Sequence, residues 1–419
     1  MHHFTYKGNE LHCEDVPVSR IAQDIGTPLY LYSHATLLQH FRAFDGAFSD
    51  VAHLTCFAVK SNSSLAILKL FAIEGGGADI VSGGELYRAL KAGVDPKKIV
   101  YSGVGKTGEE IEYALRSEIL MFNVESSQEI NLLNEVAGRI GKRASIAIRV
   151  NPDVDPKTHP YISTGLKESK FGIEIERALE DYTVAAGLRH LRVAGVSCHI
   201  GSQLTQVSPF VDALGKLKVL IEKLRETGIA VQYLDLGGGL GITYDKEEPP
   251  HPDEYAEALK RELHAQDLTV ILEPGRVITG NAGILVARVL YIKRSPEKTF
   301  IVVDAAMNDL IRPSLYGSYH AIQPVRRSER RMVKADVVGP ICESTDFLAK
   351  NRETAVFEPT DLMAVMSAGA YGFSMSSNYN SRPRVPEVMG VGDRYFVIRS
   401  RETYEDLVRG ENIPDFMGE

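Results

Sequence analysis

The chain is expected to be an α/β protein in which a (β/α)8 TIM barrel is joined to a mostly antiparallel β domain. The barrel is predicted because eight short β-rich runs alternate with amphipathic helical patterns, over a length of about 240 residues. The second domain is predicted because this alternation stops near residue 280. The 419 residues are enough for two domains with a hydrophobic core each.

The eight runs are continuous stretches of apolar residues, as expected for parallel strands that are buried on both faces. They lie at 54–60, 78–82, 98–103, 119–125, 145–150, 193–200, 231–236 and 268–274. Helix boundaries are marked as well, with Ser82 and Ser126 at N-cap positions and Gly93 and Gly228 where helices should stop. A doubly wound open sheet is the alternative, but such sheets usually contain fewer strands.

The barrel is assigned to residues 34–280 and the β domain to residues 1–33 together with 281–419. After residue 280, strand-like segments without long helices between them lie at 283–293, 299–305, 331–339, 361–367 and 394–401. Two more strand-like pieces, 2–8 and 28–33, precede the barrel pattern. They are assigned to the same domain because chain termini often lie together.

Composition argues against several classes of function. A formal net charge of −8 makes the chain a poor ligand for nucleic acid or for an anionic membrane. The four cysteines form no CxxC pair, so neither a disulfide framework nor a metal site is expected. The N-terminus does not resemble a signal peptide, and no apolar run is long enough for a membrane helix. A cytoplasmic location is the resulting expectation.

Chemistry in a TIM barrel takes place at the carboxyl ends of the strands, so the residues that end each run are the candidates. Lys60 ends the first run, where a desolvated amine would be nucleophilic towards aldehydes, although a lone lysine there is more often structural. Gly237–Gly239 follow the seventh run and would let backbone N–H groups approach an anion. Glu273 and Arg276 follow the eighth run across a stiff Pro-Gly turn.

The remaining strand ends add polar residues of the types that a phosphorylated ring needs. His199 and Ser202 follow the sixth run, where the imidazole could stack on a flat ring and the hydroxyl could donate to a phosphate. Asp79 lies at the predicted end of the second strand, where it could simply be solvated, and the fifth strand contributes Arg149. The joint occurrence of lysine, glycine loop, glutamate and histidine favours a site for pyridoxal 5′-phosphate (PLP). The expected partner is a small amino-acid substrate that binds in the same site.

One segment favours a different class of protein. Gly103, Gly105 and Gly108 match the GxGxxG pattern, after a predicted strand and before a predicted helix. Glu125 ends the next strand about 20 residues further on, as in dinucleotide-binding proteins. An NAD-dependent dehydrogenase is therefore the alternative, although it leaves Lys60 and the glycine loop without a role.

Nine segments of the chain resemble the group IV PLP decarboxylases, whose barrel is similar to that of alanine racemase. The segments keep their order from about residue 20 to residue 400: FAVKSN, ADIVSGGEL, SKFGI, CHIGSQ, LDLGGGLG, EPGR, RPSLYGSYH, GPICESTD and GAYGFSMSSNYNSRPR. Within that group the chain resembles the diaminopimelate decarboxylases, because ornithine-type relatives carry CDS instead of CES and lack RPSLYGSYH. The resemblance implies decarboxylation of meso-2,6-diaminopimelate to L-lysine and CO2, the last step of lysine biosynthesis. Another basic amino-acid decarboxylase, of the ornithine or arginine type, is the alternative within the fold.

The resemblance also implies roles for residues of the cofactor site. Lys60 would carry PLP on its amine, His199 would stack on the ring, and Glu273 would pair with the pyridine nitrogen. The other residues implied to contact the cofactor are Asp79, Arg149, Ser202, Gly238, Gly239, Gly275, Arg276 and Tyr371, the last of which would also contact substrate.

The remaining implied roles concern the substrate. Arg276, Arg312 and Tyr316 would clamp its distal carboxylate, a group that arginine recognises well through two hydrogen bonds. Cys342 and Glu343 would enter the site from the other subunit of a homodimer. Cys342 would supply the proton that replaces CO2, and Glu343 would hold the distal ammonium group.

Overall fold

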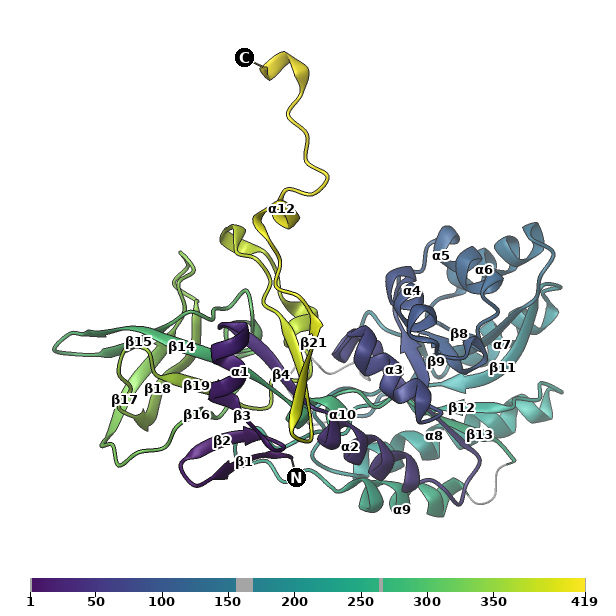
Figure 1. Cartoon of the computed structure of the whole chain (residues 1–419). Coiled ribbons are helices and arrows are strands. Elements are labelled where there is room, and N and C mark those ends of the chain that lie inside the picture. The colour runs from purple at the N-terminus through teal and green to yellow at the C-terminus, as the bar shows by residue number, and fades with distance from the viewer. Residues whose placement is uncertain (1, 156–168, 264–266, 419) are drawn as a thin grey trace. The chain divides into compact units, whose positions relative to one another are not determined.

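The computed structural model describes residues 2–155, 169–263 and 267–418, and the chain divides into two compact units. One unit is Leu38–Gly280, and the other joins Met1–Leu37 to Asn281–Glu419. Both ends of the chain, purple and yellow in Figure 1, therefore belong to the second unit.

The unit Leu38–Gly280 is built on a closed barrel of eight parallel strands, which confirms the predicted TIM barrel. In the order in which they pair, the strands are β5 (His53–Ala58), β6 (Gly77–Ile80), β7 (Ile99–Tyr101), β8 (Met121–Val124), β9 (Ala144–Asn151), β11 (Leu191–Ser197), β12 (Tyr233–Asp235) and β13 (Thr269–Leu272). The ring is closed because β13 pairs with β5. Each strand overlaps one of the eight apolar runs, and a two-residue strand, β10 (Ile173–Glu174), pairs with β9 outside the ring.

Helices alternate with these strands along the chain and lie around the barrel (Figure 1). They are α2 (His34–Gly46), α3 (Leu65–Ile73), α4 (Gly83–Ala92), α5 (Gly108–Arg116), α6 (Ser127–Arg139), α7 (Ala178–Gly187), α8 (Ser208–Glu226), α9 (Pro252–Leu263) and α10 (Arg276–Thr279). The expected N-caps are confirmed, because the hydroxyls of Ser82 and Ser126 each accept the N–H of the third helical residue. Gly93 ends α4 with φ +83°, a conformation that favours glycine. Among the described residues, no helix is long and apolar enough to cross a membrane.

Burial explains why the barrel strands appear in the sequence as continuous apolar runs. Every residue of β6, β7 and β8 is buried, so neither face of these strands needs polar side chains. One apolar cluster joins six strands of the ring through Cys56, Val100, Met121, Ala147, Ala194 and Ile271. Apolar side chains fill the interior of the barrel at this level, so polar side chains that could bind a ligand lie at the ends of the strands.

The other unit is a mostly antiparallel sheet, as predicted. Its strands pair in the order β18 (Phe347–Ala355), β17 (Met332–Val338), β15 (Thr299–Val303), β14 (Gly283–Arg294), β4 (Leu29–Ser33), β20 (Glu387–Val391) and β21 (Arg394–Arg399). β19 (Leu362–Val365) also pairs with β14, and β16 (Ile322–Pro324) pairs with β19. A small sheet contains β1 (Phe4–Lys7), β2 (Glu10–Cys13) and β3 (Val16–Pro17), and the helices are α1 (Val18–Ile25), α11 (Arg312–Tyr316) and α12 (Tyr404–Leu407).

Candidate active site

Lys60 lies just beyond the carboxyl end of β5 rather than in the strand itself. The strand ends at Ala58, and Lys60 is the middle residue of a 3-10 turn, Val59–Ser61. Its ammonium group forms an ion pair with Asp79, a fully buried residue of β6, while 33% of the Lys60 side chain is exposed. The second carboxylate oxygen of Asp79, Oδ1, is buried and has no hydrogen-bond partner among the described residues. A buried carboxylate thus holds an accessible amine at the strand ends.

Arg276 and Ser202 meet next to the ends of β13 and β11. The guanidinium of Arg276 donates from Nη2 to the Ser202 hydroxyl at 3.0 Å and from Nη1 to the Tyr244 hydroxyl at 2.7 Å. Arg276 is only 5% exposed, so its charge is held in a protected place. Tyr244 is not among the predicted site residues, because no local pattern distinguishes it from an ordinary loop tyrosine.

The glycines after β12 are packed so closely that no side chain fits. A Cβ atom on Gly238 would lie 2.1 Å from the carbonyl oxygen of Glu273, and one on Gly239 would lie 2.5 Å from that of Gly201. Gly239 also has φ +122°, which side chains rarely permit. Packing between the ends of β11, β12 and β13 therefore requires glycine here, apart from any ligand that the loop binds.

His199 presents a neutral ring in a defined tautomer. Its Nδ1 accepts the N–H of Gly238 at 3.1 Å, which leaves the ring proton on Nε2. Burial holds the pKa of the His199 imidazole well below its usual value, and the positive charges of Arg149 and Lys60 lower it further. The ring is consequently uncharged at neutral pH, and its flat face could stack on another flat ring.

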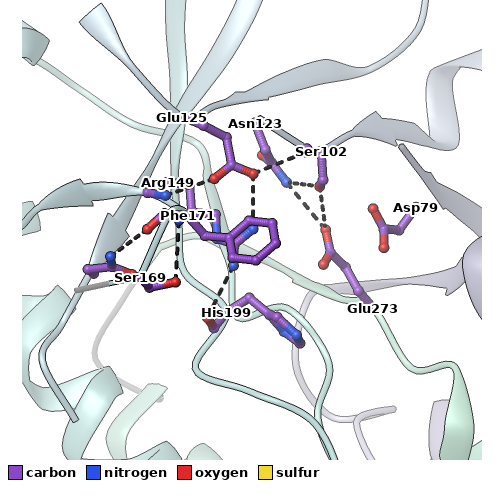
Figure 2. A network of polar contacts seen from close by, with 12 residues as sticks. Asp79, Ser102, Asn123, Glu125, Arg149, Ser169, Phe171, His199 and Glu273 are labelled. Carbon is purple, nitrogen blue, oxygen red and sulfur yellow. Dashed lines mark hydrogen bonds and ion pairs between the residues drawn. The ribbon is translucent and has the colours of Figure 1, made fainter. Parts of the chain in front are cut away.

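Glu273 belongs to a buried polar network that links four strands (Figure 2). Its Oε1 accepts the Ser102 hydroxyl and the Asn123 amide, both at 3.3 Å. The same Asn123 nitrogen donates to Asp235 Oδ2 at 2.7 Å. Burial raises the pKa of Glu273 well above its usual value, with help from the charges of Asp235 and Asp79, and burial raises that of Asp235 to about 6.

Sequence reasoning did not select Ser102, Asn123 or Asp235. The available signal was a polar residue at or next to an otherwise apolar strand, as in MFNVE for Asn123 and YLDL for Asp235. A polar side chain in such a strand has to find a buried partner.

Arg149, in β9, is held by protein groups on both sides. Its Nη1 donates to Glu125 Oε1 at 3.0 Å, and its Nη2 donates to the backbone carbonyl of His199 at 3.4 Å. The guanidinium also lies 4.9 Å from the ring centroid of Phe171 (Figure 2). Arg149 thus connects β8, β9 and the residues after β11.

The GxGxxG loop is filled by groups of the chain itself. The Lys106 ammonium, on a side chain that is 1% exposed, donates to the carbonyls of Gly103 and Asn123 at 2.8 and 2.7 Å. It also pairs with Glu129 at 2.6 Å. The N-terminus of α5 is closed by a capping box that begins at Thr107. The N–H groups of Gly103, Thr107 and Glu110 are therefore already bound by side chains of the protein.

Arg312 and Tyr316 are brought together in the β-sheet unit by the short helix α11. Arg312 is 5% exposed, and its guanidinium donates to the Ser318 hydroxyl at 3.2 Å. The guanidinium carbon lies 5.9 Å from the centre of the Tyr316 ring. In the same unit, Tyr371 has φ +55°, a conformation with a cost of order 1 kcal/mol that often marks functional positions.

Cys342 and Glu343 lie in the loop between β17 and β18. Cys342 is exposed, whereas Cys13, Cys56 and Cys198 are buried. The Cys342 N–H donates to the Asn380 side chain at 2.8 Å, which anchors the loop. A thiol that is both exposed and fixed in place is available to a reacting group.

Comparison with known proteins identifies the class. The family model of the pyridoxal-binding domain of pyridoxal-dependent decarboxylases matches residues 34–280. The chain is 54% identical to the diaminopimelate decarboxylase of Haemophilus influenzae, over 97% of this chain and 98% of that protein. The crystal structure of the Helicobacter pylori diaminopimelate decarboxylase complexed with L-lysine has 45% identity and a TM-score of 0.90, and covers 93% of this chain and 98% of that one. That of M. jannaschii, also with L-lysine, has 38% identity and a TM-score of 0.94, and covers 99% of this chain and 100% of that one.

The barrel, matched over residues 34–280, defines the chain as a pyridoxal-dependent decarboxylase. Sequence identity over the full length narrows this class further. The chain belongs to the diaminopimelate decarboxylase family. The expected family, enzyme class and PLP cofactor are thus confirmed, and the dehydrogenase alternative is wrong.

Proposed function

We propose that the residues at the carboxyl ends of the barrel strands are where this enzyme decarboxylates meso-2,6-diaminopimelate. The reaction gives L-lysine and CO2 and is the last step of lysine biosynthesis. The observation that carries the assignment of the site is the ion pair between accessible Lys60 and fully buried Asp79. An amine that carries a cofactor has to be oriented, and Asp79 can orient Lys60 at the carboxyl ends of the barrel strands.

The side chains at the strand ends fit PLP. Asp79 has a buried oxygen without a partner among the described residues, and Glu273 is a buried carboxyl group that a cationic ring nitrogen would stabilise. Arg276 and Ser202 offer a cation and a hydroxyl for a phosphate, and His199 offers a neutral flat ring. When bound, the cofactor accepts electrons from the substrate's α-carbon, which allows CO2 to leave.

We assign cofactor binding to the residues selected from the sequence. They are Lys60, Asp79, Arg149, His199, Ser202, Gly238, Gly239, Glu273, Gly275, Arg276 and Tyr371. Lys60 would hold the cofactor through its amine, and Asp79 keeps the Lys60 ammonium group in place when the lysine is free. Glu273 holds a proton at the ring nitrogen.

Substrate recognition is assigned to residues that match the charges of diaminopimelate. Arg276, Arg312 and Tyr316 bind the distal carboxylate, and the Arg312–Tyr316 contact within α11 supports a shared role. Glu343 binds the distal ammonium group. Cys342 donates a proton to the α-carbon after CO2 has left, and its exposure in the chain supports this role.

We further propose that the enzyme is a cytoplasmic homodimer with shared active sites. Cys342 and Glu343 then act in the site of the partner subunit, while Lys60 acts in its own. Exposure of Cys342, in contrast to the three buried cysteines, is the feature that this arrangement explains.

The site is tested by an absorbance spectrum of the purified protein, before and after addition of meso-diaminopimelate. The visible band of lysine-bound PLP should change on addition, and L-lysine and CO2 should appear, but not with ornithine or arginine. Lys60→Ala should remove the band, whereas Lys69→Ala, a change of an exposed lysine on α3, should keep it. A Lys60→Ala protein that retains the band would overturn the assignment.

A further inference from the structure

Two buried carboxyl groups, Asp235 and Glu273, lie around a single amide nitrogen. Asn123 Nδ2 donates to Asp235 Oδ2 at 2.7 Å. The same nitrogen contacts Glu273 Oε1 at 3.3 Å (Figure 2). Asp235 is 0% exposed, Asn123 1% and Glu273 6%. Within the described ranges, neither carboxyl group forms an ion pair with a lysine or arginine. Water and cationic side chains therefore screen the repulsion between the two carboxyl groups only weakly.

The hydrogen bonds decide which of the two groups carries the negative charge. Asp235 accepts two short bonds, from Asn123 and from the Gly237 N–H at 2.9 Å. Glu273 receives longer contacts from Ser102 and Asn123, each at 3.3 Å, and its carboxyl group also hydrogen-bonds with that of Asp235, which raises the pKa of Glu273 and lowers that of Asp235. Two adjacent buried carboxyl groups cannot both be ionised without a large electrostatic cost. Asp235 has the stronger hydrogen bonds, so it is the anion, and Glu273 keeps the proton. The raised pKa of Glu273, and the smaller increase for Asp235 to about 6, agree with this order.

We propose that Asp235 is a positioning residue that keeps Glu273 loaded with the proton that Glu273 donates to the ring nitrogen of the cofactor. The inference rests on the proposed role of Glu273 in the site. In the donation, the O–H bond of Glu273 breaks and an N–H bond forms on the ring, which leaves a carboxylate beside a ring cation. The total charge of the group does not change, and Asp235 remains an anion throughout. The negative charge of Asp235 raises the affinity of Glu273 and the ring nitrogen, taken together, for the one proton that they share, so that this proton is not lost to solvent at neutral pH.

Other charged groups also face the pair, and among them the positive charge of Lys60 lowers the pKa of Glu273. Asp79 is paired with Lys60, and its charge acts in the same direction as that of Asp235 on Glu273. Cys56 and Cys198 stay as thiols because burial and the nearby carboxylates raise the pKa of both, that of Cys198 to about 12. His199 stays neutral, since its pKa is lowered well below the usual value, and Arg149 is paired with Glu125. Asp235 and Glu273 therefore titrate as one coupled pair.

Infrared spectroscopy of the full chain without cofactor tests the pair directly. The wild-type protein should show the carbonyl band of a protonated carboxyl group at pH values well above the ordinary pKa of glutamate, and Glu273→Gln should remove this band. Asp235→Asn should lower the midpoint of the band by at least about one pH unit, a tenfold change in proton affinity. Absence of the band in the wild type, or an unchanged midpoint in Asp235→Asn, would overturn the proposal.

A charge exchange supplies the matched control. Asp235→Asn alone places two amide groups face to face, whereas Asn123→Asp with Asp235→Asn restores donor and acceptor and returns one carboxylate to the network. In the double variant, the pH midpoint of the carbonyl band should return most of the way to its wild-type value. If it behaves like Asp235→Asn, the effect is a packing defect and the electrostatic proposal fails.

Binding of a cofactor analogue then connects the pair to the ring nitrogen. Wild-type protein should bind PLP more tightly than 1-deaza-PLP, which has no ring nitrogen, and Asp235→Asn should reduce that preference about tenfold. An equal loss for both ligands would show a merely structural role and overturn the inference. If neither ligand binds at Lys60, the proposed site fails instead, while the infrared result for the pair still stands.

Discussion

Replacement of Lys106 by methionine should destabilise the barrel strongly, although Lys106 lies outside the proposed site. Its ammonium group has three acceptors, the carbonyls of Gly103 and Asn123 and the carboxylate of Glu129, at 2.6–2.8 Å. Methionine has a similar shape and no charge, so the change removes the cation with little disturbance of packing. Glu129, whose side chain is 7% exposed, then becomes a buried carboxylate without its cation.

The expected loss follows from the cost of breaking a buried ion pair on one side, about 3–5 kcal/mol. For a unit of this size, that corresponds to a fall in the thermal midpoint of about 6–20 °C. Thermal unfolding of purified wild type and Lys106→Met measures it, with Lys69→Met on α3 as the exposed control, for which a change within about 0.5 kcal/mol is expected. Lys106→Met combined with Glu129→Gln should recover much of the loss, because no charge is then left buried.

The loss of stability in Lys106→Met should also depend on pH. Burial already raises the pKa of Glu129 although Lys106 lowers it, so removal of Lys106 raises it further. The folded variant then binds a proton that the unfolded chain, with a glutamate pKa of about 4.3, has released. The loss is therefore smallest below about pH 4 and grows as the pH rises through the folded pKa. A loss under about 1 kcal/mol at neutral pH, or one that is equal at acid and neutral pH, would refute this reasoning.

Three other predictions concern the site. Mixing Lys60→Ala with Cys342→Ala protein should restore up to about a quarter of wild-type activity, because hybrid dimers keep one intact site, and no return at any mixing ratio counts against shared sites. Glu343→Asp should lower kcat/KM for diaminopimelate roughly tenfold, since the shorter side chain withdraws the carboxylate from the ammonium group, and unchanged kinetics would remove this role. Gly238→Ala should lower the free energy of unfolding by about 1–3 kcal/mol or more, because its Cβ would lie 2.1 Å from a carbonyl oxygen. Gly187→Ala, with open space around it, should be tolerated in the same unfolding assay.

The barrel could be predicted because local burial repeats eight times. Strands buried on both faces have to be apolar throughout, and the chain becomes polar where each strand ends. That change marked Lys60, Asp79 and Glu273 as candidates without any structure. The exact strand end was not visible, because Lys60 continues an apolar run but lies in a turn after β5.

Edge elements of the β-sheet unit were harder to predict. β18 has the sequence FLAKNRETA, in which charged residues occupy exposed positions and the apolar pattern is interrupted. It forms a strand because β17 pairs along it, with two register shifts, and this pairing is a tertiary interaction. Strands of this kind have little intrinsic signal, since their stability depends on neighbours.

The GxGxxG segment shows the limit of a local motif. The glycines follow a strand and precede a helix, as a dinucleotide site requires, and the same arrangement occurs in a barrel. Lys106 and Glu129, 23 residues apart in the chain, meet in the loop and occupy it. Only the three-dimensional arrangement shows that Lys106 is buried in this loop and pairs there with Glu129.

The order of apolar runs, caps and polar strand ends by itself predicted the fold and the class of cofactor, and the resemblance of nine sequence segments indicated the family. The tertiary structure alone decided which polar groups meet, because Asn123 reaches Asp235 across 112 residues and Ser102 reaches Glu273 across 171. Proton affinities follow from distance and burial, and neither quantity is written in the order of residues. For that reason the glutamate could be found from the sequence, but the aspartate that controls its proton could not.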